Sequence, residues 1–316
     1  MKVLANDGIS KNGIEKLESA GFAVVTISVA QEQLINYINN ENIVVLLVRS
    51  ATKVRKNLID TCPSLKIIGR GGVGMDNIDV EYARSKGICV INTPSASSES
   101  VAELVFAHLF SGVRYLYDSN RNMPLDGDSK FKELKKAYAN GTELRGKTLG
   151  IIGFGRIGQA TARIALGLGM NVIANDPYTK SAKLNLKFFD GQNITFKVNI
   201  LSKEQVLKQS DFISLHVPAQ KDFVIGKDEI ELMKDGAGLV NAARGGVVDE
   251  VELIKSLKSG KLAFAGIDTF ENEPNPSVQV LMTSNASLTP HIGAATIQAQ
   301  DRIGSELATQ IIKILK

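Results

Sequence analysis

Three glycines near the middle of the chain have the spacing of a turn that binds a dinucleotide. Gly153, Gly155 and Gly158 form a GxGxxG pattern directly after an apolar run and at the start of a helix-like stretch. The first glycine permits a tight turn, the second lets the backbone approach a pyrophosphate, and the third lets a helix pack close to a strand. The N-terminus of that helix favours the phosphate charge. We therefore predict a dinucleotide site here, with Arg156 and Ile157 as further phosphate contacts.

A carboxylate follows this turn at the separation expected for ribose recognition. Asp176 ends the next apolar run, about 20 residues beyond the glycines, where an acid commonly binds the ribose hydroxyls. Its charge would repel the 2′-phosphate of NADP, so NAD is the predicted cofactor. The nearby Lys180 leaves NADP open as an alternative.

The three histidines of the chain lie in different sequence contexts. His108 lies inside the apolar stretch AELVFAHLF, which predicts a buried, structural side chain. His216 ends the run FISLHV before Pro218, near the expected cofactor edge, and is predicted to line the site. His291 follows Pro290 in a loop, where a rigid scaffold usually presents reactive groups. Because an imidazole with a pKa near ~6.5 exchanges protons at neutral pH, His291 is the candidate acid/base.

The apolar runs that carry these residues alternate with polar, helix-like stretches. This alternation predicts an α/β fold of two doubly wound parallel-sheet domains, Rossmann-like and flavodoxin-like, with a cleft between them. Strands are expected at 3–6, 23–27, 43–48, 65–69 and 89–92, and again at 149–153, 171–175, 212–217, 237–241 and 264–268. Helices are expected at 11–20, 31–39, 100–117 and 294–315, with an extra strand or a surface hairpin around 194–198 inside the polar segment 179–210.

Length and composition predict two globular domains. At about 100 to 200 residues per domain, 316 residues are enough for two. The motifs place a substrate-binding domain at 1–98 plus 292–316 and an NAD-binding domain at 99–291. No apolar run approaches the ~20 residues that span a bilayer, and the first residues lack a secretory signal pattern. A cytoplasmic location is predicted.

Charge and cysteine usage argue against several kinds of ligand. The net charge is +4, without a basic run interleaved with aromatic residues, so no nucleic-acid surface is expected. Cys62 and Cys89 have neither CxxC nor Cys/His metal spacing, so neither a disulfide nor a metal site is expected. The predicted ligands are small molecules, with no membrane or nucleic-acid partner.

Three later motifs, VNAARGGVVDE, AGIDTFENEP and LTPHIGAAT, follow the glycine turn. With them the chain resembles the D-isomer-specific 2-hydroxyacid dehydrogenases over nearly its whole length. The resemblance implies that Arg244 binds the substrate carboxylate and that Glu273 partners the acid/base His291. It also implies that Asp268 contacts the nicotinamide, and within FENEP the rival to Glu273 is Glu271. Further NAD contacts are predicted at Val217, Pro218, Ala242, Ala243, Arg244, His291 and Gly293.

Two segments of the first domain are similar to those of D-3-phosphoglycerate dehydrogenases within this family. The segments are VRSATK (48–53) and GRGGVGMDNID (69–79). Amides of a glycine loop can bind a carboxylate, and several cationic or hydroxyl donors can bind a phosphate. The predicted substrate contacts are Arg49, Ser50, Lys53, Arg70, Gly71, Gly72, Val73, with the Gly74 amide, Ser97, Arg244 and His291. Ser97 and Val73 depart from the usual asparagine and Thr or Ser, and Arg55 and Lys56 are predicted to form a solvated basic face.

These residues give a leading hypothesis and two alternatives. The leading hypothesis is an NAD-dependent D-3-phosphoglycerate dehydrogenase that oxidises 3-phospho-D-glycerate to 3-phosphohydroxypyruvate in L-serine biosynthesis. The alternatives are a glyoxylate/hydroxypyruvate reductase, or another D-2-hydroxyacid dehydrogenase, and a non-catalytic dinucleotide-sensing corepressor on the same fold. The resemblance implies a homodimer, with a tetramer left open, and the length predicts a short form without a C-terminal regulatory domain.

Overall fold

The two ends of the chain build one parallel sheet together. The computed structural model describes residues 1–316, and its contacts divide them into two units. The first unit comprises Met1–Ser100 and Ala294–Lys316. Its five strands are parallel, in the order β2 (Ala23–Val25), β1 (Lys2–Ala5), β3 (Ile43–Val48), β4 (Ile67–Arg70) and β5 (Cys89–Asn92). This 2-1-3-4-5 order is that of flavodoxin-like folds, as predicted.

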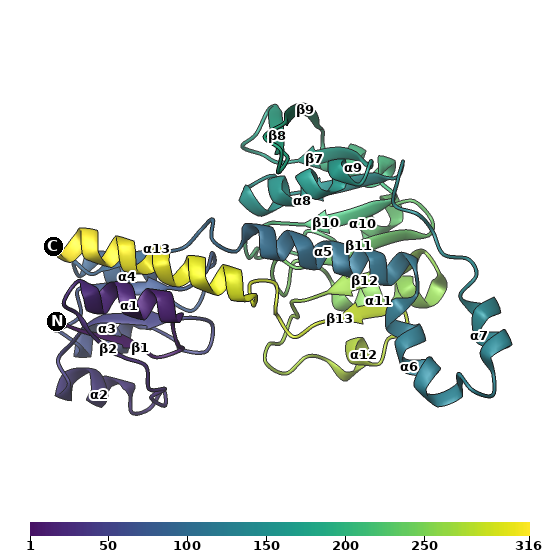
Figure 1. The fold of residues 1–316 in the computed structure, drawn as a ribbon. Helices are drawn as coiled ribbons and strands as arrows, with labels where there is room; N and C mark the ends of the chain where they lie inside the picture. The colour runs from purple at the N-terminus through teal and green to yellow at the C-terminus, as the bar shows by residue number, and fades with distance from the viewer. The chain divides into compact units, whose positions relative to one another are not determined.

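The central strands of this sheet bury side chains on both faces. Val45 and Leu47 of β3 pack toward α1 (Lys11–Ser19) and α13 (Ile297–Leu315), whereas Leu46 and Val48 pack toward the opposite layer (Figure 1). That layer consists of α2 (Leu34–Asn40), α3 (Lys56–Thr61) and α4 (Val80–Ser85). Because alternate residues of a strand face opposite sides, the apolar run 43–48 has to be covered by helices on both faces.

Helix α13 joins this unit from the far end of the chain. It begins after Thr296, whose hydroxyl accepts a hydrogen bond from the Ala299 amide, so the predicted start at residue 294 is three residues too early. Ile297, the first residue of the helix, is 78% exposed because it precedes the segment that packs on the sheet. Close packing on α1 uses Gly304, where an added Cβ would lie 2.2 Å from the Ser10 hydroxyl oxygen.

The second unit, Val101–Gly293, contains the larger sheet. Its eight strands have the order β13 (Ala286–Leu288), β12 (Leu262–Ile267), β11 (Ala237–Asn241), β10 (Phe212–Leu215), β6 (Thr148–Ile152), β7 (Asn171–Asn175), β9 (Asn193–Ile200) and β8 (Ala182–Lys187). All neighbouring strands are parallel except the β8–β9 pair. The strand order reverses between β6 and β10, as in Rossmann folds, and ligands of such sheets bind at the carboxyl ends of the strands beside this point.

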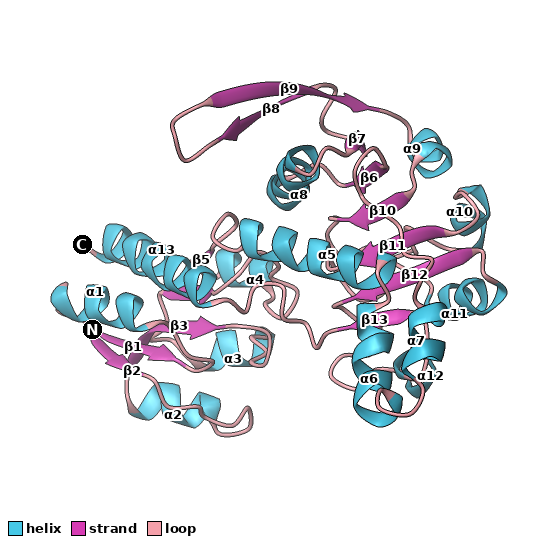
Figure 2. Ribbon diagram, turned by 45° about the vertical axis from the view of Figure 1, so that its right-hand side comes forward, coloured by secondary structure: helices cyan, strands magenta, loops and turns pink.

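The segment 179–210 forms the predicted hairpin. Strand β8 pairs antiparallel with β9, and the end of β9 continues the main sheet beside β7. Figure 2 shows this hairpin extending past α8 (Arg156–Gly167). The remaining helices are α5 (Ser98–Val113), α6 (Leu116–Asp126), α7 (Phe131–Ala137), α9 (Lys203–Gln209), α10 (Lys227–Leu232), α11 (Glu250–Ser259) and α12 (Val278–Leu281).

The long helix predicted at 100–117 is shorter than expected. Helix α5 ends at Val113, and Tyr115 has a φ of 53°, a left-handed conformation that cannot continue an α-helix. Within α5, Gly112 lies against the ring of Phe264, and an added Cβ would be 2.1 Å from that ring. Strand β13 and the pair α6 and α7 were not predicted. Neither α5 nor any other helix is long and apolar enough to cross a membrane.

Two helical glycines give a matched test of the packing between α13 and α1. In Gly304→Ala, the new methyl group would displace the Ser10 hydroxyl that caps α1, so we expect a loss of about 1–3 kcal/mol in the free energy of unfolding. In Gly167→Ala, the methyl group meets nothing within 4 Å, so we expect no loss and a gain of up to about 1 kcal/mol. Urea unfolding of both variants measures the difference, and equal effects would contradict the close-packing argument.

Candidate functional site

The three glycines of the predicted turn have distinct steric roles. Gly153, directly after β6, has a φ of 91°, and an added Cβ would lie 2.4 Å from the His216 carbonyl oxygen. At Gly158, a Cβ would lie 2.2 Å from the Gly153 oxygen, which fits a glycine required for close helix packing. At Gly155, by contrast, a Cβ would meet no heavy atom within 4 Å. The turn therefore leaves open space beside Gly155 and the N-terminus of α8, which fits a pyrophosphate.

Asp176 lies beside this turn and is tied to it. Its carboxylate accepts hydrogen bonds from the amides of Phe154, at 2.7 Å, and Tyr178, at 2.9 Å. Burial pushes the pKa of Asp176 upward, but these hydrogen bonds outweigh burial and leave the pKa below its usual value. The residue is thus negatively charged at neutral pH. This charge fits the predicted ribose contact and disfavours a 2′-phosphate.

His216 lies at the end of β10, across the switch point from the glycine turn. Its Nε2 lies 2.9 Å from the Ser214 hydroxyl, and its buried Nδ1 has no hydrogen-bond partner in the protein. Burial lowers the pKa of His216 to about 3, so the ring is neutral at physiological pH. An imidazole that is neutral at physiological pH fits a role in lining the site and not in proton transfer. Of the predicted contacts that follow it, Val217 is half-buried, like His216, and Pro218 is exposed.

The Arg244 loop is folded by the side chain that ends β11. Asn241 accepts a hydrogen bond from the Ala243 amide, at 3.1 Å, and donates one to the Arg244 carbonyl, at 2.9 Å. Gly245 packs so tightly that an added Cβ would lie 1.7 Å from the Phe270 carbonyl oxygen. The loop after β11 is therefore pressed against the loop after β12. Ala242 and Ala243 are buried beneath Arg244.

Glu273 and His291 are in direct contact. The Nδ1 atom of His291 lies 2.8 Å from Oε2 of Glu273, and the other carboxylate oxygen accepts a hydrogen bond from the Phe270 amide at 3.0 Å. Burial raises the pKa of Glu273. The hydrogen bonds with His291 and Phe270 and the charge of Arg244 lower it by more, so the pKa is below its usual value. An ionised carboxylate beside an imidazole stabilises the imidazolium and orients the ring.

Glu271, the rival partner of the histidine, points elsewhere. Its carboxylate accepts a hydrogen bond from the Glu250 amide, at 3.0 Å, and its own amide donates to the Glu250 carboxylate, at 2.9 Å. This reciprocal pair ties the loop after β12 to the first residue of α11. Of the two candidates, only Glu273 contacts His291.

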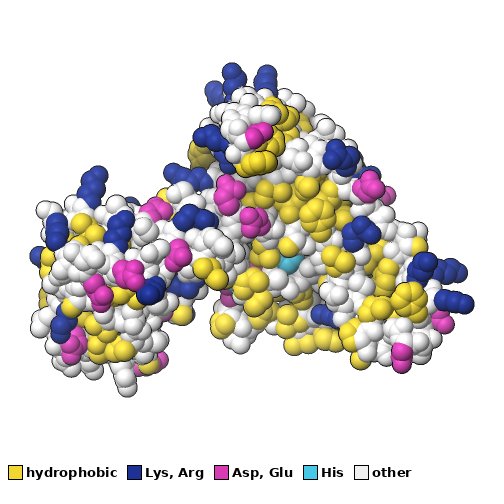
Figure 3. Space-filling view, viewed as in Figure 1, with side chains coloured by type: hydrophobic (Ala, Val, Ile, Leu, Met, Phe, Trp, Pro, Cys, Tyr) yellow, Lys and Arg dark blue, Asp and Glu magenta, His cyan; other side chains and the backbone are white.

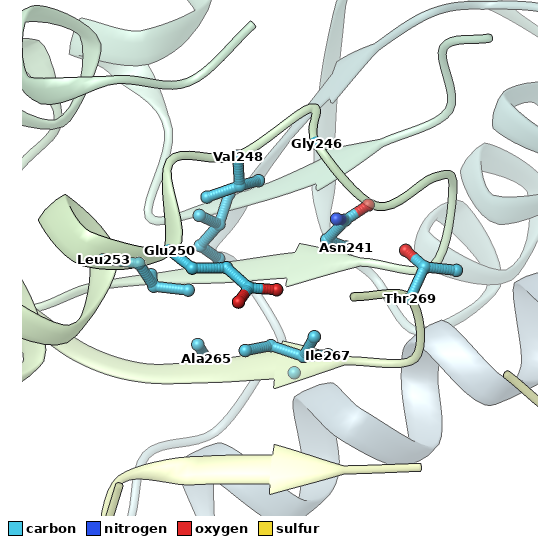
Figure 4. Close-up of a pocket in the computed structure, with 10 residues that line it drawn as sticks. Asn241, Gly246, Val248, Glu250, Leu253, Ala265, Ile267 and Thr269 are labelled. Carbon is cyan, nitrogen blue, oxygen red and sulfur yellow. The ribbon is translucent and has the colours of Figure 1, made fainter. Parts of the chain in front are cut away.

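Glu250 was missed by sequence reasoning. Its side chain is buried and points into a small cavity also lined by Asn241 and Thr269 (Figure 4). Burial raises the pKa of its carboxyl group and outweighs the hydrogen bond from the Glu271 amide, which lowers the pKa; the Glu271 charge makes a smaller raising contribution. Asn241 and Gly246, at the two ends of the Arg244 loop, line the same cavity. The Glu250 carboxylate holds the loop that carries Glu273 through the Glu271 amide. A glutamate after a capping Asp249 reads as an ordinary helix start, so no sequence signal marked it.

Asp268 organises the loop that contains His291. Its carbonyl oxygen accepts a hydrogen bond from the His291 amide, at 2.8 Å, and its carboxylate oxygens accept from the amides of Ile292, at 2.8 Å, and Gly293, at 2.9 Å. The side chain is 1% exposed. Its described contacts are with the loop, and the nicotinamide contact implied by the resemblance stays a prediction.

The predicted substrate residues of the first unit lie at the carboxyl ends of β3 and β4. Arg49 is half-buried, and Ser50 and Lys53 are exposed. Of the four loop amides predicted to bind a carboxylate, those of Gly71 and Gly72 donate to the carbonyls of Val48 and Arg70. A carboxylate contact of this loop stays a prediction. Arg70 donates a hydrogen bond to the Gly71 carbonyl.

Ser97 is buried, whereas the basic pair Arg55 and Lys56 is exposed. Ser97 is 2% exposed, so a substrate contact there would require the surrounding loop to move. Arg55 forms an ion pair with Asp79 at 2.9 Å, and the Lys56 ammonium lies 5.1 Å from the centre of the Tyr82 ring. Both are exposed, as predicted for a solvated face.

The sheet topology and the glycine turn define a Rossmann-type dinucleotide-binding protein, with an ion-paired histidine beside a cationic loop. A family model described as "D-isomer specific 2-hydroxyacid dehydrogenase, NAD binding domain" matches residues 106–293. The chain belongs to this family of D-isomer-specific 2-hydroxyacid dehydrogenases.

The proteins similar to this chain are named for different activities. A D-3-phosphoglycerate dehydrogenase of Methanocaldococcus jannaschii is 40% identical, with alignment of 100% of this chain and 58% of that protein. A hydroxypyruvate reductase of Thermotoga maritima is 41% identical over 99% of this chain and 98% of its own length. The crystal structure of an NAD⁺-bound 3-phosphoglycerate dehydrogenase of Entamoeba histolytica has a TM-score of 0.77 and 28% identity, covering 99% of this chain and 95% of that one. This chain thus spans little more than half of the archaeal relative.

The buried His216 ring predicts a specific sensitivity to acid. An unfolded histidine takes up a proton below about pH 6.5, whereas the folded ring has a pKa of about 3. Between these values the unfolded state binds the extra proton. The free energy of unfolding therefore decreases as the pH is lowered, by up to about 1.4 kcal/mol per pH unit. We expect His216→Asn to lose less free energy of unfolding than the wild type between about pH 7 and about pH 5.5. Equal losses in urea titrations would contradict the neutral, buried ring.

Proposed function

We propose that this protein is an NAD-dependent D-2-hydroxyacid dehydrogenase. The observation that carries the proposal is the contact of 2.8 Å between His291 and Glu273, in the same unit as a glycine turn with open space for a pyrophosphate. Oxidation of a secondary alcohol needs a group that accepts the hydroxyl proton while hydride leaves. The corepressor alternative predicts loss of that group, whereas His291, Glu273 and Arg244 are all present.

The proton is held at His291. In the oxidation direction the neutral ring accepts the substrate hydroxyl proton at Nε2, because Nδ1 faces Glu273. In reduction the same atom returns the proton to the carbonyl oxygen, and the ionised Glu273 stabilises the imidazolium in both directions. When bound, NAD supplies the nicotinamide that accepts or returns the hydride. The Glu273 carboxylate stays ionised because its pKa is lowered.

Arg244 binds the substrate carboxylate in this proposal. A guanidinium can form two parallel hydrogen bonds to a carboxylate, which fixes the adjacent carbon for hydride transfer. Asn241 and Gly245 support this role because they fold the loop and press it against the loop of Glu273. For the cofactor, the open space at Gly155 and the charge of Asp176 favour NAD over NADP.

We infer that the substrate is 3-phospho-D-glycerate, oxidised to 3-phosphohydroxypyruvate as in L-serine biosynthesis. Phosphoglycerate dehydrogenases of M. jannaschii and Archaeoglobus fulgidus, at 40% and 38% identity, support this assignment. Arg49 and Lys53 supply cations at the end of β3 that suit a phosphate. The second candidate is reduction of hydroxypyruvate or glyoxylate. It is supported by the T. maritima reductase, which has nearly the same length, and by a glyoxylate reductase of Thermococcus litoralis at 41% identity.

We also infer a homodimer formed through the second unit. The apolar side chains of α6 and α7 are unusually exposed, among them Leu125 at 75% and Phe131 at 56%. Hydrophobic side chains also gather over α5 on the face shown in Figure 3. Exposed apolar patches of this kind mark surfaces that bind another protein.

A substrate panel tests the proposed function. Purified protein with NAD should form NADH from 3-phospho-D-glycerate, and NADP should support a lower rate because Asp176 is charged. NADH formation or consumption is followed by its absorbance. Turnover confined to hydroxypyruvate and glyoxylate would select the second candidate. No turnover of any D-2-hydroxy acid or 2-keto acid would overturn the enzymatic proposal.

The two neighbouring glutamates give a matched test of the proton-transfer pair. Glu273→Gln removes the charge beside His291, so we expect kcat to fall roughly 10- to 100-fold with little change in NAD affinity. Glu271→Gln keeps an oxygen that can accept from the Glu250 amide, and its kcat should stay within about threefold of the wild type. Equal losses in the two variants would contradict the assignment of Glu273.

A further inference from the structure

We propose that His108, Ser287 and Thr289 form a buried hydrogen-bond chain that positions His291 by orienting Asp268. The proposal rests on the function proposed for His291, and it makes these three residues positioning residues. None of them touches a reacting atom. The chain connects helix α5 and the end of β13 to the loop of residues 289–293.

The chain consists of three consecutive short contacts. The Ser287 hydroxyl lies 2.9 Å from Nδ1 of His108, and Nε2 of His108 lies 3.1 Å from the Thr289 hydroxyl. The Thr289 hydroxyl donates to Oδ1 of Asp268 at 2.6 Å. The same Asp268 oxygen accepts the Ile292 amide, and its other oxygen accepts the Gly293 amide. The chain therefore ends on the carboxylate that holds the loop.

The number of available protons fixes the direction of each hydrogen bond in the chain. Thr289 has a single hydroxyl proton, and it is directed at the carboxylate. Nε2 of His108 must then carry the proton that Thr289 accepts, which leaves Nδ1 as the acceptor for the Ser287 hydroxyl. A neutral imidazole has one proton and one lone pair, so it fits this arrangement. Burial lowers the pKa of His108, with a smaller opposing effect of Asp268, which keeps the ring neutral.

The position of His108 is fixed by packing on the sheet. The residue is 2% exposed, and an added Cβ on Gly266 of β12 would lie 2.5 Å from the His108 Cβ. Gly266 pairs with Ser287 of β13 in the parallel register. A glycine at this position thus lets the imidazole lie over the sheet within reach of both hydroxyl groups.

The chain matters because the backbone of His291 is in an unfavourable conformation. Its φ is 53°, in the left-handed region that few non-glycine residues adopt. The Asp268 carbonyl binds the His291 amide, and the Asp268 carboxylate binds the next two amides. A carboxylate turned away from those amides would release the loop and with it the ring that faces Glu273. Thr289 opposes that rotation because its hydroxyl donates to Oδ1, and His108 in turn holds the Thr289 hydroxyl in place.

Thr289→Val and Thr289→Ser form the matched pair that tests this inference. Valine preserves the shape and removes the hydroxyl group, whereas serine preserves the hydroxyl group. We expect kcat of Thr289→Val to fall on the order of 10- to 100-fold, as for small misplacements of a catalytic group. The dissociation constant for NADH, measured by fluorescence, should stay within about threefold. Thr289→Ser should retain kcat within about threefold. Equal kcat values for the two variants, or a wild-type kcat in Thr289→Val, would overturn the proposal.

A measurement on the wild-type protein tests the chain without relying on activity. The protein has only three histidines, so two-dimensional ¹⁵N–¹H spectra of the imidazole rings can be assigned by single replacements. We expect the His108 ring to be neutral, with its proton on Nε2, between about pH 6 and about pH 8. A proton on Nδ1, or a charged ring, would overturn the chain even if the enzyme is active. The expected tautomer in a protein that turns over no 2-hydroxy acid would instead support the chain and refute the proposed function.

Discussion

Three consecutive amides, those of His291, Ile292 and Gly293, donate hydrogen bonds to Asp268, the first to its carbonyl oxygen and the others to its carboxylate. This set of contacts holds a histidine in the left-handed region while its ring faces Glu273. Backbone strain of this kind persists only where the surroundings over-determine the conformation. The buried environment strengthens such hydrogen bonds and makes their loss costly. The geometry of the candidate catalytic histidine therefore depends on a residue that is itself hidden from solvent.

The parallel sheet brings the remaining parts of the site to one edge. The glycine turn follows β6, His216 follows β10, the Arg244 loop follows β11 and Asp268 follows β12. Because these strands run in the same direction, their carboxyl ends meet on one side of the sheet. Glycines then set how closely the loops approach, most clearly at Gly245, where a Cβ would overlap the carbonyl of Phe270. The separation between Arg244 and Glu273 along the chain is thus bridged by backbone packing.

Burial also assigns different protonation states to similar side chains. It keeps His216 and His108 neutral, whereas Glu273 remains ionised because hydrogen bonds outweigh its burial. Glu250 has a raised pKa instead, because its burial outweighs the hydrogen bond from the Glu271 amide. A site with one ionised carboxylate beside one half-exposed histidine is suited to moving a single proton. The other two rings serve as neutral hydrogen-bonding groups.

The amino-acid sequence alone determined the alternating α/β pattern, the glycine turn, the acid at its expected separation and His291 as the candidate base. These features are local: they follow from apolar periodicity, from glycine geometry and from loop position. The extra strand or hairpin in 179–210 was also predicted. The break at Tyr115 was not, and the start of α13 was placed too early although Thr296 is a local capping residue. Only the tertiary structure decided between Glu271 and Glu273, paired the Gly71 amide of the predicted carboxylate loop with the Val48 carbonyl, and joined His108 to Thr289. Each of these outcomes requires groups far apart in the chain to meet within hydrogen-bond distance, and spacing along the chain does not encode that meeting.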